Sequence, residues 1–123
     1  MQKLYLLYFA ESGRLIGMYS ELRKVFGRKP DPLLAITHDV MGDQRVNWQN
    51  VEDTLGVPVE HYFRDDVPEP LRDFLRSQNA ALPVIVGLDQ QGKNQVVCTR
   101  DDIAACRGEA DALAEKLRQR LAA

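Results

Sequence analysis

The two cysteines carry the most reactive side chains of the chain, and they do not form a Cys-x-x-Cys pair. Cys98 and Cys106 are the only thiols among 123 residues, and their spacing fits neither a zinc site nor the disulfide framework of a secreted domain. Cys98 comes just before an expected helix, whose free N–H groups can acidify a thiol, so a redox role stays open beside an inert one. Cys106 falls on the apolar face of that helix, where we expect an inert buried thiol.

A second group of chemically useful side chains lies in the polar segment 38–46. It contains His38, Asp39 and Asp43, one imidazole and two carboxylates. These residues could form an acid–base pair or a weak metal site, although their spacing is not that of a metal motif. The alternative is a solvated loop whose acids cap the next helix. The other histidine, His61, lies in an expected strand and is interpreted as structural.

Short apolar runs that alternate with helical periodicities must position these residues. Strands are expected at 3–9, 33–37, 57–63, 84–88 and 94–98. Helices are expected at 14–26 and from Asn47 to Leu55. A third helix is expected after Pro68, with Pro70 in its first turn, and a last helix is expected to begin at a capping box formed by Thr99 and Asp102. Gly108 is expected to bend or split the last helix. The run LLAIT at 33–37 has no polar alternation, which is typical of a central strand covered on both faces.

The element order is therefore β-α-β-α-β-α-β-β-α, which predicts an α/β fold with one domain over residues 1–123. Strand 33–37 is expected at the centre of a mixed sheet of about five strands, parallel to 3–9 and 58–63. The strands 84–88 and 94–98 are separated by a Gly-containing polar segment, which predicts an antiparallel hairpin.

Composition excludes several classes of function. The net charge is −2, and no basic field of the kind that nucleic-acid binders carry is present, so no nucleic-acid partner is expected. No stretch approaches the roughly 18 apolar residues of a membrane helix. The apolar run 4–9 is too short for the core of a signal peptide. We therefore expect a cytoplasmic protein with reduced thiols.

Three segments resemble the thioredoxin/glutaredoxin superfamily. Residues 59–66, followed by 68–72, are similar to the third strand and the following helix of a glutaredoxin. Residues 82–86 (LPVIV) are similar to the strand that opens with the family's cis-proline, which implies a cis bond between Leu82 and Pro83. Residues 100–105 (RDDIAA) are similar to the segment that holds the amino-acid end of glutathione. The resemblance covers roughly residues 32–120 and implies a thioredoxin-like fold.

The sequence departs from the superfamily at the site of its chemistry. The family places a cysteine where the second strand meets the second helix, and the corresponding segment 37–45 (THDVMGDQR) contains none. Without a thiolate there is no nucleophile for disulfide exchange.

The resemblance then implies a non-catalytic module that binds a protein or peptide through the degenerate active-site edge. The alternative is a glutathione-binding or thiol-dependent redox protein of glutaredoxin type, and glutathione is the one cofactor considered. The residues expected at this edge are His38, Asp39, Met41, Asp43, Leu82, Pro83, Thr99, Arg100 and Asp101.

Overall fold

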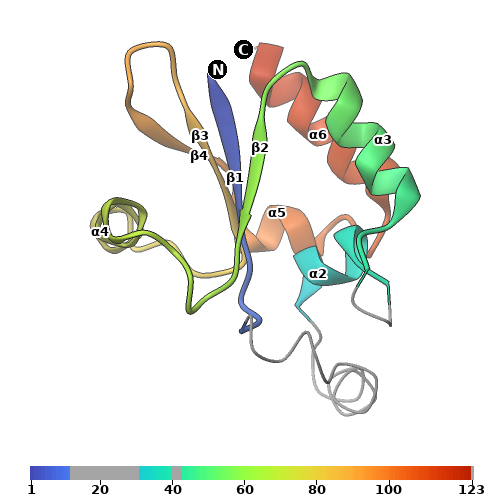
Figure 1. The fold of residues 1–123 in the computed structure, drawn as a ribbon, viewed down its shortest axis with the longest axis horizontal. Helices are drawn as coiled ribbons and strands as arrows, with labels where there is room; N and C mark the ends of the chain where they lie inside the picture. The colour runs from blue at the N-terminus through green and yellow to red at the C-terminus, as the bar shows by residue number, and fades with distance from the viewer. Residues whose placement is uncertain (12–30, 40–42, 123) are drawn as a thin grey trace.

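A four-stranded mixed sheet forms the centre of the computed structural model, which describes residues 1–11, 31–39 and 43–122 (Figure 1). The strands are β1 (Lys3–Leu7), β2 (Val59–Tyr62), β3 (Val84–Leu88) and β4 (Asn94–Cys98), and they lie in the order β2-β1-β3-β4. β1 pairs in parallel with β2 and antiparallel with β3. The expected antiparallel hairpin of β3 and β4 is confirmed. β1 and β2 are parallel, but they pair directly, whereas strand 33–37 was expected between them.

The expectation for residues 33–37 is wrong, because this segment is a helix, α2 (Pro32–Thr37). The Asp31 carboxylate accepts hydrogen bonds from the N–H groups of Leu33 and Leu34, and Pro32 opens the first turn. The apolar run is buried because α2 packs inside the core, against α3 (Val46–Leu55) and α5 (Arg100–Ala104). The described residues therefore form four strands instead of about five, and β1 takes a central place in the sheet.

Helices cover both faces of the sheet. In Figure 1, α4 (Glu69–Ser77) lies on one face, whereas α2, α3, α5 and α6 (Ala110–Ala122) lie on the other. Apolar side chains fill the space on each side. Leu4 and Leu6 of β1 belong to the larger cluster with α2, α3 and the C-terminal helices, and Leu7 belongs to the smaller cluster with α4.

Several local signals are confirmed. Helix α3 carries Trp48 and Val51 on its buried side, and Pro70 lies in the first turn of α4. Thr99 and Asp102 form the capping box of α5. The last helix is split into α5 and α6, and Gly108 lies between them with φ +77°, a conformation that L side chains rarely adopt. The helix expected at 14–26 lies outside the described residues.

Candidate functional site

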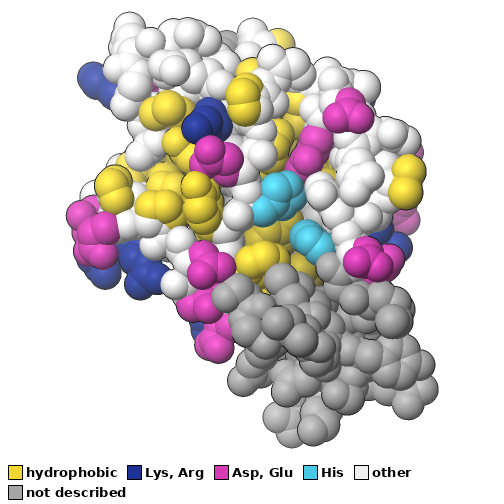
Figure 2. All heavy atoms as spheres, viewed as in Figure 1, with side chains coloured by type: hydrophobic (Ala, Val, Ile, Leu, Met, Phe, Trp, Pro, Cys, Tyr) yellow, Lys and Arg dark blue, Asp and Glu magenta, His cyan; other side chains and the backbone are white. Residues whose placement is uncertain are grey.

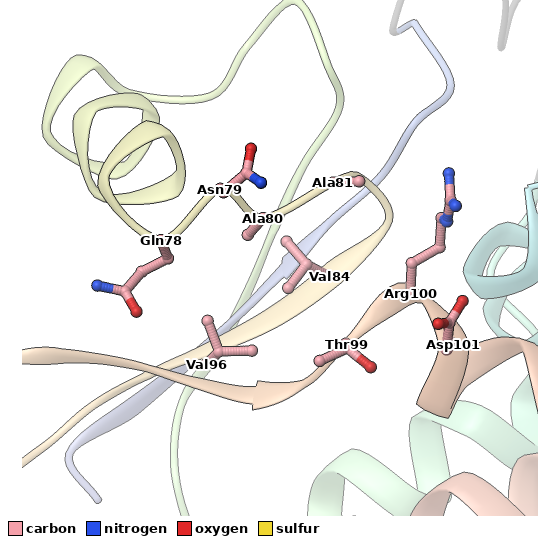
Figure 3. A pocket seen from close by; sticks show the side chains of 9 residues that line it. All are labelled: Gln78, Asn79, Ala80, Ala81, Val84, Val96, Thr99, Arg100 and Asp101. Atoms are coloured by element: carbon pink, nitrogen blue, oxygen red, sulfur yellow. The ribbon is translucent and has the colours of Figure 1, made fainter.

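A cavity of about 310 Å³ lies between the end of α4, the turn into β3 and the start of α5 (Figure 3). Residues 78–81 and 99–101 form its two walls, and Val84 and Val96 form its floor. Two of the three segments expected to form the degenerate active-site edge, the turn at 81–83 and the helix start at 99–101, therefore lie next to each other.

The wall at the start of α5 combines one structural residue with two unpaired charges. The Thr99 hydroxyl accepts a hydrogen bond from the Asp102 N–H at 3.2 Å, so this side chain is used to cap the helix. Asp102 is held by Arg120, with Nη1 2.6 Å from Oδ2, and this hydrogen bond lowers the pKa of Asp102. Arg100 and Asp101 are exposed, and their side chains make no hydrogen bond or ion pair with the described residues.

The opposite wall offers main-chain groups. The peptide bond between Leu82 and Pro83 is cis, and the proline ring is buried. The Leu82 side chain packs partly against the smaller core cluster. Among the described residues, the main-chain N–H and C=O groups of Ala81 and Leu82 find no hydrogen-bond partner, because β3 begins only at Val84. These groups are available to a bound molecule.

The described part of the segment 38–45 does not line this cavity. The Asp39 N–H donates to the Asp43 carbonyl at 2.8 Å, and the Asp43 N–H donates to Asp39 Oδ1 at 3.1 Å, so these two acids close a turn. His38 packs instead against the rings of Tyr8, His61 and Phe63. Met41 lies outside the described residues.

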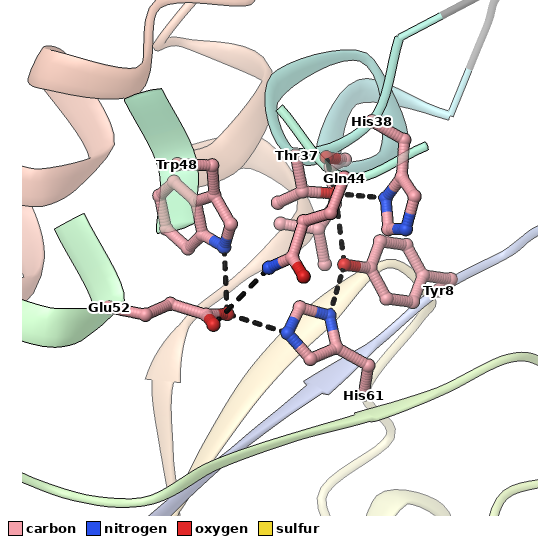
Figure 4. Close-up of polar contacts among 8 residues, drawn as sticks. Tyr8, Thr37, His38, Gln44, Trp48, Glu52 and His61 are labelled. Carbon is pink, nitrogen blue, oxygen red and sulfur yellow. Dashed lines mark hydrogen bonds and ion pairs between the residues drawn. The ribbon is translucent and has the colours of Figure 1, made fainter. Parts of the chain in front are cut away.

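The structure reveals a polar cluster that the sequence did not predict (Figure 4). The His61 ring is its centre: Nε2 lies 2.5 Å from Glu52 Oε1, and Nδ1 lies 2.6 Å from the Tyr8 hydroxyl. The Tyr8 hydroxyl lies 2.9 Å from Thr37 Oγ1, which in turn lies 2.7 Å from His38 Nδ1. Four elements or their ends thus meet here: β1, α2, α3 and β2.

Burial sets the protonation of this cluster. Tyr8, Thr37 and Trp48 are fully buried, and burial raises the pKa of Tyr8 far above its ordinary value. Burial, followed by repulsion from His61, lowers the pKa of His38 to about 4.

Glu52 is the anionic end of the cluster. Burial would raise the pKa of Glu52, but hydrogen bonds from His61, from Trp48 Nε1 at 2.8 Å and from Gln44 at 3.2 Å outweigh it, so the pKa is lowered.

A weak signal for this cluster was present in the sequence. Buried tyrosine and tryptophan side chains need hydrogen-bond partners for their polar atoms. Tyr8 follows an apolar strand, and Trp48 precedes Glu52 by one helical turn, so both residues called for a polar neighbour. The spacing gave no indication that His61 would contact Tyr8 and also the Glu52 carboxylate that accepts from Trp48.

Both thiols are buried and reduced. Burial raises the pKa of Cys98 to about 11, so proximity to the start of α5 does not acidify it. Burial also raises the pKa of Cys106, whose S–H group donates to the Asp102 carbonyl at 3.4 Å. Neither side chain provides a thiolate at neutral pH.

No family model matches the chain, and neither a curated protein nor a solved structure is significantly similar to it. None of the described helices is long and apolar enough to cross a membrane. The described part of the chain also has no group of three or more His, Cys, Asp or Glu side chains arranged to hold a metal ion. Fold and site define the class as an α/β domain with a four-stranded mixed sheet flanked by helices, and they identify no particular protein.

Proposed function

We propose that the chain is a thioredoxin-like module without dithiol chemistry, which binds an extended segment of a protein or peptide at the cavity between residues 81–83 and 99–101. A mixed sheet with a parallel pair and a closing antiparallel hairpin is compatible with that fold. The buried thiols support the absence of dithiol chemistry, because neither is a nucleophile at neutral pH. Two free cysteines are also what a protein of the reducing cytoplasm would carry.

The observation that carries this proposal is the unpaired main chain of Ala81 and Leu82 beside a cavity. An extended peptide binds such groups by adding its own main-chain hydrogen bonds, while its side chains enter neighbouring pockets. Val84 and Val96 give the floor apolar contact for one such side chain. Arg100 and Asp101 then offer one positive and one negative charge to the flanking residues of the peptide.

The same two charges favour a second candidate. Arg100 and Asp101 lie unpaired beside the Leu82–Pro83 bond, where they are positioned to hold the two charged ends of a γ-glutamyl ligand such as glutathione. This candidate requires no reactive cysteine if the protein only binds glutathione. The two candidates differ in whether a free peptide or glutathione occupies the cavity.

A peptide selection tests the proposal. Peptides selected from a random library on the purified chain should shift the backbone amide NMR signals of Ala81 and Leu82. Arg100→Glu should weaken binding about tenfold, the effect of losing one charge-assisted hydrogen bond. Arg118→Glu, on the exposed side of α6, is the matched control and should leave binding unchanged.

The outcome separates three cases. Selected peptides that bind Arg100→Glu as tightly as the parent chain, or that shift signals elsewhere, would refute the peptide site. Millimolar reduced glutathione that shifts the Ala81 and Leu82 signals would favour the glutathione candidate. Shifts with peptide and none with glutathione would support the peptide-binding module.

A further inference from the structure

We propose that Glu52, His61, Tyr8 and Thr37 form a directed proton relay that makes His38 Nε2 an accessible proton acceptor for a hydroxyl or thiol of a bound molecule. This site is separate from the cavity beside Pro83. Figure 2 shows both histidine side chains at the surface of one face of the molecule. Figure 4 shows that His38 turns its Nδ1 atom toward Thr37, and no dashed line reaches its other ring nitrogen.

The direction of the relay is fixed at its Glu52 end. The Glu52 carboxylate accepts from the Trp48 indole N–H and the Gln44 amide, and both of these groups can only donate. A carboxylate has no proton to give, so the third contact, with His61 Nε2 at 2.5 Å, must be donated by the imidazole. In a neutral His61, Nδ1 is then an acceptor.

Each further hydrogen bond follows from the one before. The Tyr8 hydroxyl must donate its single proton to His61 Nδ1, so its oxygen must accept from Thr37. The Thr37 hydroxyl has then donated its proton, and it accepts from His38 Nδ1. The Leu33 carbonyl, at 3.2 Å, is the longer and weaker alternative acceptor for Thr37. His38 is therefore held as the Nδ1–H tautomer, and its Nε2 carries a lone pair.

The Nε2 atom of His38 is left without a partner among the described residues. The charged and titratable groups of the described residues that face this ring are Tyr8, Asp39, Arg45, Glu52 and His61. His38 holds a proton poorly because burial and His61 both disfavour its charged form. The Glu52 carboxylate, 2.5 Å from His61 Nε2, places the negative charge of the cluster at the opposite end of the relay from His38.

The relay allows this transfer with all protons accounted for. A proton taken from a ligand O–H or S–H binds His38 Nε2, and the Nδ1 proton passes to Thr37 Oγ1. The Thr37 proton passes to the Tyr8 oxygen, and the Tyr8 proton passes to His61 Nδ1. His38 ends as the neutral Nε2–H tautomer, and His61 ends as an imidazolium paired with Glu52. The three hydrogen bonds from His38 through Thr37 and Tyr8 to His61 have reversed their direction, and His61 Nε2 still donates to Glu52.

The first experiment reads the tautomers directly. Ring-nitrogen NMR of the full chain at pH 7.5 should show His38 with its proton on Nδ1 and His61 with its proton on Nε2. Thr37→Val, which keeps the shape but removes the hydroxyl, should release His38 to the Nε2–H tautomer. Thr37→Ser, which keeps the hydroxyl, should retain Nδ1–H. A parent chain with His38 protonated on Nε2, or a Thr37→Val variant with an unchanged tautomer, overturns the relay.

Tyr8→Phe cuts the chain at a second point, so the test does not depend on one variant folding. It should leave the proton of His61 on Nε2, because Glu52 still accepts it, while the Thr37 hydroxyl turns its proton to the Leu33 carbonyl. Each variant is first compared with the parent by amide NMR and circular dichroism. If Tyr8→Phe is folded and its His61 carries the proton on Nδ1, the direction assigned at Glu52 is wrong and the relay is refuted.

The second experiment tests whether the acceptor is accessible. Diethyl pyrocarbonate reacts with an unprotonated ring nitrogen, which attacks its carbonyl carbon and expels ethyl carbonate. An ordinary histidine with a pKa near 6.5 should react about tenfold more slowly at pH 5.5 than at pH 7.5. His38 should slow less than twofold, and mass spectrometry should place the adduct there. No adduct on His38, faster reaction of His61, or a tenfold loss at His38 each contradict the proposal.

Discussion

Replacing Asp31 by alanine removes the carboxylate that joins the end of β1 to the start of α2. Oδ2 accepts the main-chain N–H groups of Phe9 at 2.8 Å and Ala10 at 3.1 Å. Oδ1 accepts those of Leu33 at 3.0 Å and Leu34 at 3.2 Å. The residue is only 8% exposed, so water replaces few of these bonds after truncation.

The cost follows from these four bonds. Loss of the helix cap contributes about 1 kcal/mol. The bonds to Phe9 and Ala10 are to a charged acceptor, and leaving such donors unpaired costs about 1–3 kcal/mol. We expect Asp31→Ala to lower the free energy of unfolding by about 3 kcal/mol in total. For a chain of this length that corresponds to a fall in Tm of roughly 10 °C.

Urea unfolding, followed by circular dichroism and by the fluorescence of buried Trp48, measures this cost. Asp31→Asn keeps one acceptor oxygen and should lose about half as much stability. Asp111→Ala, an exposed acid in the first turn of α6, is the matched control and should change stability by less than about 0.5 kcal/mol. An Asp31→Ala variant within about 0.5 kcal/mol of the parent would refute the role assigned to this carboxylate.

Three further outcomes are expected. The pKa of His38 is lowered to about 4, so its contribution to stability is complete above pH 6.5 and is lost as the pH falls toward 4. Urea unfolding over this pH range should show a loss of roughly 1–2 kcal/mol after solvent screening, and His38→Gln should remove this part of the pH dependence. Cys98 and Cys106 should react with a thiol reagent only after unfolding, because burial raises both pKa values, and fast reaction in the native protein would contradict this. Gly87→Ala places a Cβ atom 2.9 Å from Val97 Cγ2, so we expect a loss of about 1–3 kcal/mol in the same unfolding assay.

The parts of the fold that the sequence predicted correctly are those specified by local chemistry. Thr99 and Asp102 are three residues apart, and that spacing alone allows each side chain to cap the other's N–H group. The hairpin of β3 and β4 is marked by apolar strands around a turn that contains Gly92, which has φ +80° in the structure. Neither feature depends on distant residues.

The segment 33–37 was misinterpreted because four apolar residues followed by a threonine, without alternation, fit a buried strand or a buried helix equally well. The deciding signal lay just before it, where Asp31 and Pro32 are typical of a helix start. The polar cluster was beyond prediction for a different reason. Tyr8 and His61 are 53 residues apart, and only the parallel pairing of β1 with β2 brings them together.

Correcting residues 33–37 changes where a site is expected on this sheet. In open α/β sheets, ligands gather at the carboxyl ends of the parallel strands, and those strands are now β1 and β2. Tyr8 directly follows β1 and His61 lies in the last half of β2, so the relay stands at this edge. Leu7 pairs with Val84, which places the Pro83 turn at the same edge.

The two candidate sites therefore share one edge of the sheet and draw on different core clusters. Tyr8 belongs to the core cluster of α2 and α3, whereas Val84 belongs to the cluster of α4. A peptide bound at Ala81 and Leu82 would reach the edge from the α4 side, and a protic ligand would reach His38 from the other. Because the relay and the cavity lining share no residue, Thr37→Val should abolish the Nδ1–H tautomer of His38 without changing peptide affinity. Loss of both properties in that variant would show that the two sites are one.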